Sequence, residues 1–320
     1  MENSVARASF MVTRRMILAG FAAAALPRVA RAADPTLVAT TAMIADAARA
    51  LTGLPVKALI GPGMDPHGHR PTRLDILTLS RADLVLWHGL NLEAQFADLM
   101  AGLAQKTTVL AVAETLPADL LLSDPDYPDR PDPHVWFDPA LWSRVTEAME
   151  PALAVHAADI ATKGLAYRQQ IADIGAYAQS VIDTVPAESR ILVTAHDAFA
   201  YFGRAFGFDV EGVQGISTES EAGLSRISEL VDVLVTRRIP AVFVESSVSD
   251  RALRALIEGA ASKGHTVKIG GELFSDAMGP EGSYEGTWVG MMDHNATTIA
   301  RALGGTAPER GAKGLLGAAG

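Results

Sequence analysis

Short apolar runs alternate with amphipathic stretches along most of the chain. In its first part, the runs of strand length are 36–40, 56–60, 84–87 and 108–112. The stretches with helical periodicity between them are 43–52, 72–81 and 92–104. Short buried strands that alternate with helices are typical of parallel sheets built from β-α-β units. The pattern therefore predicts an α/β lobe in this part of the chain.

The same alternation returns in the second part of the chain. Here the expected strands are 190–194, 209–213, 241–245 and 266–269. The expected helices are 199–206, 223–237, 250–262 and 287–303. The fold class is therefore predicted as α/β with two lobes, each a parallel β-sheet flanked by helices.

Two helical stretches, 140–156 and 158–184, lie between the two alternating parts. The second keeps an apolar stripe across two glycines, and Pro186 ends it. We predict one long rigid helix that joins the lobes. The resulting division of the chain is an N-terminal lobe at 33–156, a connecting helix at 157–185, a C-terminal lobe at 186–303 and a flexible tail at 304–320.

Residues 1–32 have the features of a signal peptide. The twin arginine Arg14 and Arg15 precedes an apolar run at 16–26, and a small-x-small cleavage site ends at Ala32. The run is shorter than a bilayer span. We therefore expect export to the periplasm as a soluble protein. The twin-arginine route is favoured, and the Sec route is the alternative.

Charge and cysteine content narrow the function classes. The chain has 27 Lys and Arg against 37 Asp and Glu; without residues 1–32 the counts are 22 and 36, a formal charge of −14. This acidic excess argues against a nucleic acid partner. The chain has no cysteine, so a metal site must be built from nitrogen and oxygen ligands. No later stretch has the character of a membrane helix.

Two stretches share the sequence Asp-Pro-His and place a histidine in a proline-rich turn. They are Asp65-Pro66-His67 and Asp132-Pro133-His134. Because proline fixes φ and removes a backbone donor, each histidine is held in an ordered turn. A neutral imidazole aimed at a fixed point suits a metal ligand. The competing interpretation is a buried turn histidine bonded to a carbonyl oxygen.

Two further candidate ligands, His196 and Asp276, each follow an expected strand of the second lobe, as His67 does in the first. Ligands bind at the carboxyl ends of parallel strands. We therefore expect His67 and His134 from one lobe to meet His196 and Asp276 from the other in the cleft. Three imidazoles and one carboxylate suit Zn²⁺ or Mn²⁺, with Cu²⁺ open on affinity order. A closed shell of four protein ligands argues for binding rather than hydrolysis.

Neighbouring polar residues have less definite roles. Four carboxylates are candidates to accept the second N–H of a ligating imidazole: Asp65, Asp138, Asp197 and Glu245. The competing interpretation is that each is an ordinary solvated carboxylate. His69 is two residues from His67, so in an extended loop its ring is expected to point away from the site. His88 is expected to be a structural or supporting residue.

Several of these stretches together resemble the metal-binding substrate-binding proteins of zinc and manganese ABC transporters (cluster A-I solute-binding proteins). The stretches that carry the resemblance are 61–71, 132–139, 193–201, 212–223, 242–247 and 273–288. The resemblance implies two α/β lobes joined by one long helix, an ion held between them, and delivery to a membrane permease. It also implies that the metal ligands are His67, His134, His196 and Asp276.

Departures from the family pattern bear on the choice of metal. Position 69 is histidine where an aromatic residue is common, and His196 is histidine where manganese-specialised members often have glutamate. Both features favour zinc. The histidine-rich loop of many zinc-specific members is missing, which favours manganese. We therefore expect zinc first and manganese second.

Other function classes are kept as alternatives. A secreted metallohydrolase would need an open zinc position and a general base, and the chain has neither His-Glu-x-x-His nor Gly-x-Ser-x-Gly. A metal-dependent adhesin or a metal chaperone could use the same scaffold. We expect a monomeric binding protein that is not an enzyme.

Overall fold

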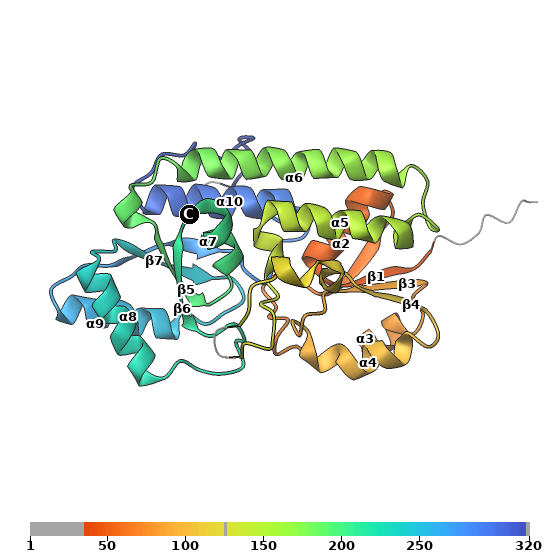
Figure 1. Cartoon of the computed structure of the whole chain (residues 1–320), viewed down its shortest axis with the longest axis horizontal. Helices are drawn as coiled ribbons and strands as arrows, with labels where there is room; N and C mark the ends of the chain where they lie inside the picture. Colours follow the sequence, from red (N-terminus) through yellow and green to blue (C-terminus); the bar gives the residue numbers. More distant parts are fainter. Residues whose placement is uncertain (1–34, 125–126, 318–320) are drawn as a thin grey trace, which may run out of the picture. The chain divides into compact units, whose positions relative to one another are not determined.

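In the computed structural model, the described residues are 35–124 and 127–317. The expected signal peptide at 1–32 and the end of the expected tail at 318–320 lie outside them. The described part contains two parallel four-stranded sheets with helices on both sides (Figure 1), so the predicted α/β class with two lobes is confirmed. None of the helices in these ranges is both long and apolar enough to cross a bilayer.

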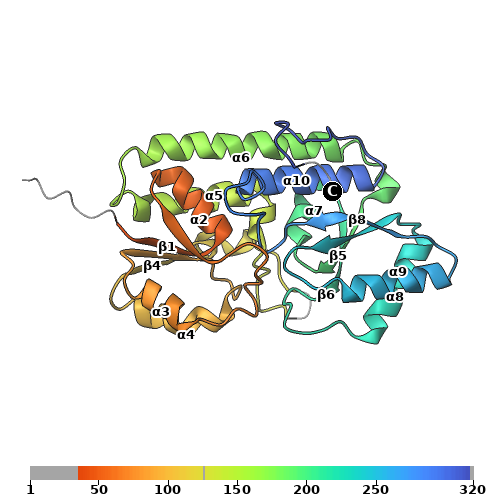
Figure 2. The same ribbon diagram turned by 180° about the vertical axis from the view of Figure 1, so that it is seen from behind.

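The first half is organised around a sheet with the strand order β2-β1-β3-β4, in which all neighbours are parallel. Its strands are β1 (Leu37–Thr41), β2 (Val56–Ile60), β3 (Leu84–Trp87) and β4 (Thr108–Ala111). Its helices are α2 (Ala42–Thr52), α3 (Arg73–Leu79) and α4 (Ala97–Leu103). Side chains alternate across a strand. Leu37 and Ala39 of β1 therefore pack with α2, whereas Val38 packs with α3 and α4 on the opposite face (Figure 2).

The second half has a sheet with the strand order β6-β5-β7-β8, again parallel throughout. Its strands are β5 (Ile191–His196), β6 (Asp209–Gln214), β7 (Ala241–Glu245) and β8 (Lys268–Leu273). Its helices are α7 (Ala200–Phe206), α8 (Leu224–Thr236), α9 (Arg251–Ser262) and α10 (Trp288–Ala302). Val193 of β5 packs with α8 and α9, and Leu192 packs into the core formed with α7 and α10.

Two helices, α5 (Pro139–Leu153) and α6 (Ile160–Ile182), lie between the halves in sequence. Helix α6 is continuous; it packs against α2 and α5 of the first half and against α7 and α10 of the second (Figure 1). Gly164 and Gly175 lie within the helix at points where α6 comes close to α5. A Cβ at Gly164 would collide with the side chain of Glu150.

One hydrophobic core extends across both halves. Its buried side chains come from both sheets and from the helices between them, and they include Leu37, Trp142, Ile171, Phe243 and Trp288. Trp288 begins α10, donates its backbone N–H to Asp46 of α2 at 2.9 Å, and stacks on Trp142 with ring centroids 6.2 Å apart. The halves are therefore joined by packed side chains as well as by the connecting chain.

Some element boundaries differ from the prediction. Strand β8 continues to Leu273, beyond the predicted end at 269, because Gly271 and the residues after it pair with β7. Pairing with a neighbouring strand here outweighs the low strand propensity of glycine. The helix predicted at 92–104 is shorter, because a turn and a 3-10 segment, Ala94–Phe96, precede α4.

Residues 304–317 form turns that pack onto the second half instead of a flexible tail. Leu316 is buried, and the backbone N–H of Ala312 donates to the fully buried carboxylate of Asp293 in α10. This corrects the expectation for these residues. The glycine-rich composition of these residues disfavours local order, but the hydrogen bond to the buried Asp293 carboxylate holds the segment in place.

We expect little relative movement of the two halves when an ion binds, because α6 packs on both halves and the core is shared. Small-angle X-ray scattering of the metal-free and zinc-loaded protein should give closely similar curves. A wide opening of the metal-free protein would contradict this prediction.

Two buried substitutions provide the control. Trp288→Ala removes a side chain of the shared core, and Leu253→Ala removes one from the core of the second half alone. Each should destabilise the fold by about 2–5 kcal/mol. Only Trp288→Ala should change the scattering of the metal-free protein.

Candidate metal centre

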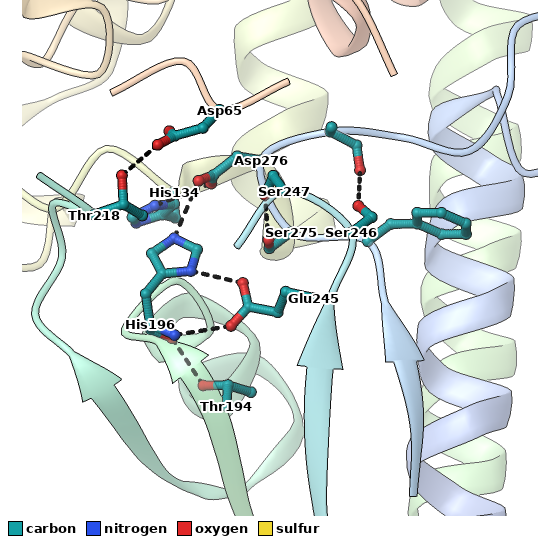
Figure 3. A network of polar contacts seen from close by, with 12 residues as sticks. Asp65, His134, Thr194, His196, Thr218, Glu245, Ser246, Ser247, Ser275 and Asp276 are labelled. Carbon is teal, nitrogen blue, oxygen red and sulfur yellow. Dashed lines mark hydrogen bonds and ion pairs between the residues drawn. The ribbon is translucent and has the colours of Figure 1, made fainter. Parts of the chain in front are cut away.

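Four buried side chains meet at one point, and they are the predicted ligands His67, His134, His196 and Asp276. Each offers one ligand atom, and these atoms all lie within 4.8 Å of one another. His67 lies between β2 and α3, and His134 lies in the turn before α5. His196 is the last residue of β5, and Asp276 follows β8 (Figure 3). The two halves therefore contribute two residues each.

The distances between these atoms match the spacing around one ion. Asp276 Oδ2 lies 3.1 Å from His196 Nε2 and 3.6 Å from His67 Nε2. Asp276 Oδ1 lies 3.3 Å from His134 Nε2, which is 3.4 Å from His67 Nε2. Two ligand atoms that are each about 2.1 Å from a tetrahedral ion lie about 3.4 Å apart. The arrangement is therefore suited to a single small cation at its centre.

Burial makes the unpaired atoms of this group costly. Asp276 is 2% exposed and His196 is 0% exposed. Both carboxylate oxygens of Asp276 and Nε2 of His196 make no hydrogen bond of good geometry. A buried polar atom without a partner costs about 1–3 kcal/mol, so such atoms are rare. A cation among them would use their lone pairs.

Two buried carboxylates fix the orientation of two of the imidazoles. Asp132 Oδ1 accepts the backbone N–H of His134 at 2.9 Å and lies 2.7 Å from the ring Nδ1. Glu245 Oε1 accepts the backbone N–H of His196 at 2.9 Å, and Glu245 Oε2 lies 2.6 Å from its Nδ1 (Figure 3). With Nδ1 directed at a carboxylate, Nε2 of each ring faces the centre.

Sequence reasoning identified Glu245 as a supporting carboxylate but missed Asp132. The available signal was its place two residues before a histidine, where a carboxylate can accept the backbone N–H of that histidine. Asp65 has the same place before His67, and it accepts that backbone N–H at 2.8 Å. Its other oxygen accepts a hydrogen bond at 2.5 Å from the hydroxyl of Thr218, which belongs to the second half (Figure 3). The shared motif therefore supports two different side-chain arrangements.

The other two candidate carboxylates have different roles. Asp138 caps α5 by accepting the backbone N–H groups of Ala140 and Leu141, and it pairs with Arg204 at 3.0 Å. Asp197 follows His196, and burial raises its pKa to about 6. Neither belongs to the group of four.

The remaining histidines near the site are also outside the group. His69 stacks on Phe96 with centroids 5.8 Å apart and lies 3.6 Å from Asp75. His88 is buried, and its Nε2 donates to the carbonyl oxygen of Pro133 at 2.7 Å. His69 therefore packs between Phe96 and Asp75, and His88 supports the turn that carries His134.

The charged groups shift one another's pKa values in opposite directions. Burial would lower the pKa of His134, but Asp132 and Asp276 outweigh it and raise that pKa to about 9. Burial would also lower the pKa of His196, but Glu245 and Asp276 outweigh it and raise that pKa well above its ordinary value. Burial lowers the pKa of His67 to about 3. Burial alone would raise the pKa of Asp276, but the imidazoles, His196 first, hold it well below its ordinary value.

Comparison with known proteins adds independent information. The family described as "Zinc-uptake complex component A periplasmic" matches residues 37–302. The manganese-binding lipoprotein MntA of Bacillus subtilis (strain 168) is 44% identical over 281 residues, covering 85% of this chain and 92% of that protein. The zinc-binding protein TroA of Treponema pallidum (strain Nichols) is 43% identical over 277 residues, covering 84% and 89%.

The fold is also shared with a solved structure. The periplasmic zinc binding protein TroA from Treponema pallidum superimposes with a TM-score of 0.81 at 43% sequence identity, covering 85% of this chain and 99% of that one. The similarity extends over both sheets and the helices between them, since it covers most of the described chain.

Removing a supporting carboxylate should weaken zinc binding without removing a ligand. Asp132→Asn and Glu245→Gln each leave an imidazole without its charged acceptor, so we expect zinc affinity to fall about 10–100-fold. Calorimetric titration with zinc measures the effect. Asp138→Asn is the matched control, because this carboxylate caps α5, and it should leave the affinity unchanged. Equal losses in all three variants would contradict the assigned roles.

Proposed function

The chain belongs to the zinc-uptake complex component A periplasmic family, and on that premise we propose that it captures a divalent transition-metal ion in the periplasm and delivers it to the permease of an ABC transporter. The observation that carries this proposal is the buried group of three imidazoles and one carboxylate, whose inward atoms have spacings that fit one ion.

A binding role suits this geometry better than hydrolysis does. A catalytic zinc site keeps one position for water or substrate beside three protein ligands. Here His67, His134, His196 and Asp276 are all buried and all face the same point. Four protein ligands complete a tetrahedral shell, which holds an ion as cargo and leaves no place for an activated water.

Zinc is the proposed cargo, with manganese as the second candidate. Three nitrogen donors favour zinc over manganese by ligand preference and affinity order. The similar proteins named above include one described as zinc-binding and one described as manganese-binding. The test is the metal content of the protein purified from the periplasm of its own host. Recovery of metal-free protein from metal-replete cells would overturn the proposal.

The partners follow from the same proposal. The permease would receive the ion, and the formal charge of −14 after residue 32 argues against a nucleic acid partner. We propose that the exported protein acts as a monomer. Uptake of zinc or manganese should fail in cells that lack the protein, whereas an adhesin would leave uptake intact.

Replacing His196 with glutamate should shift the preference toward manganese. The change exchanges a nitrogen donor for a harder oxygen donor, which lowers zinc affinity relative to manganese affinity. Competitive titration with both ions measures the ratio. His156→Glu makes the same exchange outside the group of four and should leave the ratio unchanged. An unaltered ratio in His196→Glu would remove His196 from the proposed ligands.

Zinc binding should weaken as the pH falls. Histidine binds an ion only when neutral, and the carboxylates beside His134 and His196 raise the pKa values of both rings. The metal-free protein therefore holds protons that zinc must displace. Competition is expected between about pH 7 and pH 5 from the ordinary histidine pKa of about 6.5, and it extends upward because the pKa of His134 is raised to about 9.

The proton count gives this prediction a direct measurement. Calorimetric titration in buffers with different ionisation enthalpies should show release of more than one proton per zinc ion at neutral pH. In His196→Glu the release should be smaller, because glutamate titrates near about 4.3. Release of no protons would contradict the protonation assigned to the metal-free site.

A further inference from the structure

Trp136 is a fully buried residue of the first half, two positions after His134, that makes two hydrogen bonds to the second half. Its indole Nε1 donates to the carbonyl oxygen of Ser275 at 3.1 Å, and Ser275 directly precedes Asp276. Its own carbonyl oxygen accepts the indole N–H of Trp288 at 3.1 Å. One side chain therefore connects the turn that carries His134 with the loop that carries Asp276.

The loop that carries Asp276 is held from a second direction. Asn295 of α10 accepts the backbone N–H of Phe274 at 3.0 Å and donates to the carbonyl oxygen of Phe274 at 2.7 Å. Asn295 is fully buried. The residues before Asp276 are thus fixed at Phe274 by α10 and at Ser275 by Trp136. These bonds hold the loop directly before Asp276.

The same indole also packs against the ring of His134. The two ring centroids are 5.2 Å apart with an interplanar angle of 68°. His88 also packs on Trp136, at 5.1 Å and 88°, and its Nε2 bonds to the carbonyl oxygen next to His134. Asp132 and the Trp136 indole together determine where Nε2 of His134 points.

Ordinary core packing does not account for these contacts. Trp142 belongs to the same core and is equally buried, and its ring stacks on Trp288 at 6.2 Å. The indole N–H of Trp136, by contrast, bonds to the peptide beside a proposed ligand in the other half. The 3.3 Å between His134 Nε2 and Asp276 Oδ1 depends on contacts between the halves, because the two residues come from different halves of the molecule.

We propose that Trp136 is a positioning residue that sets the spacing between His134 and Asp276, and so controls how firmly the ion is held. This inference rests on the proposed function. A displacement of a ligand by a fraction of an ångström changes the bond lengths of about 2.0–2.2 Å that zinc requires. Loss of the Trp136 contacts should increase the release rate of the ion more than it lowers the association rate, as for most changes within one binding site.

The test compares two substitutions of equal size in one core. Trp136→Phe removes the indole N–H and the contact with Ser275, and Trp142→Phe removes the same atoms next to Trp288. We expect Trp136→Phe to release zinc about 10–100-fold faster to a chelator, the range seen when ligand-orienting groups are lost. Trp142→Phe should stay within about twofold of the parent in release rate. Both should lower the melting temperature.

A spectroscopic measurement separates positioning from stability. Bound Co²⁺ reports ligand geometry through its visible absorption, which should change in Trp136→Phe and remain the same in Trp142→Phe. Unchanged release and absorption in Trp136→Phe would overturn the inference, as would equal changes in both variants. A parent protein that binds neither zinc nor manganese would instead overturn the proposed function.

The parent protein supplies a measurement that needs no variant. The indole N–H of Trp136 should exchange slowly with solvent in both the metal-free and the zinc-loaded protein, as observed by NMR, because it is fully buried and bonded to Ser275 within a core that both halves share. Fast exchange in the metal-free protein would show that the ion creates the spacing, and it would overturn the inference even if Trp136→Phe does not fold.

Discussion

The structure depends on the cost of burying the carboxylate of Asp276. This side chain is 2% exposed and has no hydrogen-bond donor of good geometry among the described residues. A buried charge must be paired or must bind a metal. The three imidazoles around it, two of them backed by Asp132 and Glu245, are the compensation that the fold provides. The two sheets lie where these groups can meet, because each sheet carries part of the group at its carboxyl edge.

Bringing the groups together requires two sheets that do not move freely. His67 and His134 come from one half, and His196 and Asp276 come from the other. Helix α6 lies along both halves (Figure 1), α10 of the second half packs on α6 and contacts α2, and the shared core contains large side chains such as Trp288. On the side of Asp65, side chains of the two halves are joined by the bond from Thr218 to Asp65 at 2.5 Å (Figure 3) and by one from Gln95 to Glu219 at 3.4 Å. This shared core limits how far the two pairs of residues can move apart.

The sequence allowed the fold class and the four converging residues to be predicted, because strand ends and proline-rich turns are local signals. Asp132 was missed because an Asp-Pro-His motif does not reveal whether the carboxylate reaches the ring or only the backbone. The end of β8 and the packing of Leu316 depend on partners far away in the chain. The hydrogen bond from Trp136 to Ser275 joins residues 139 positions apart, so no local sequence pattern predicts it.

Carboxylates lie beside two of the three histidines but not beside the third in the same way, and this difference determines the net charge of the buried site. The pKa values of His134 and His196 are raised by carboxylates, whereas burial lowers the pKa of His67 to about 3. Without an ion, two imidazoles can therefore carry protons while the third stays neutral. Two protons and one divalent cation carry the same charge. Exchange of one for the other leaves the net charge of the buried group unchanged.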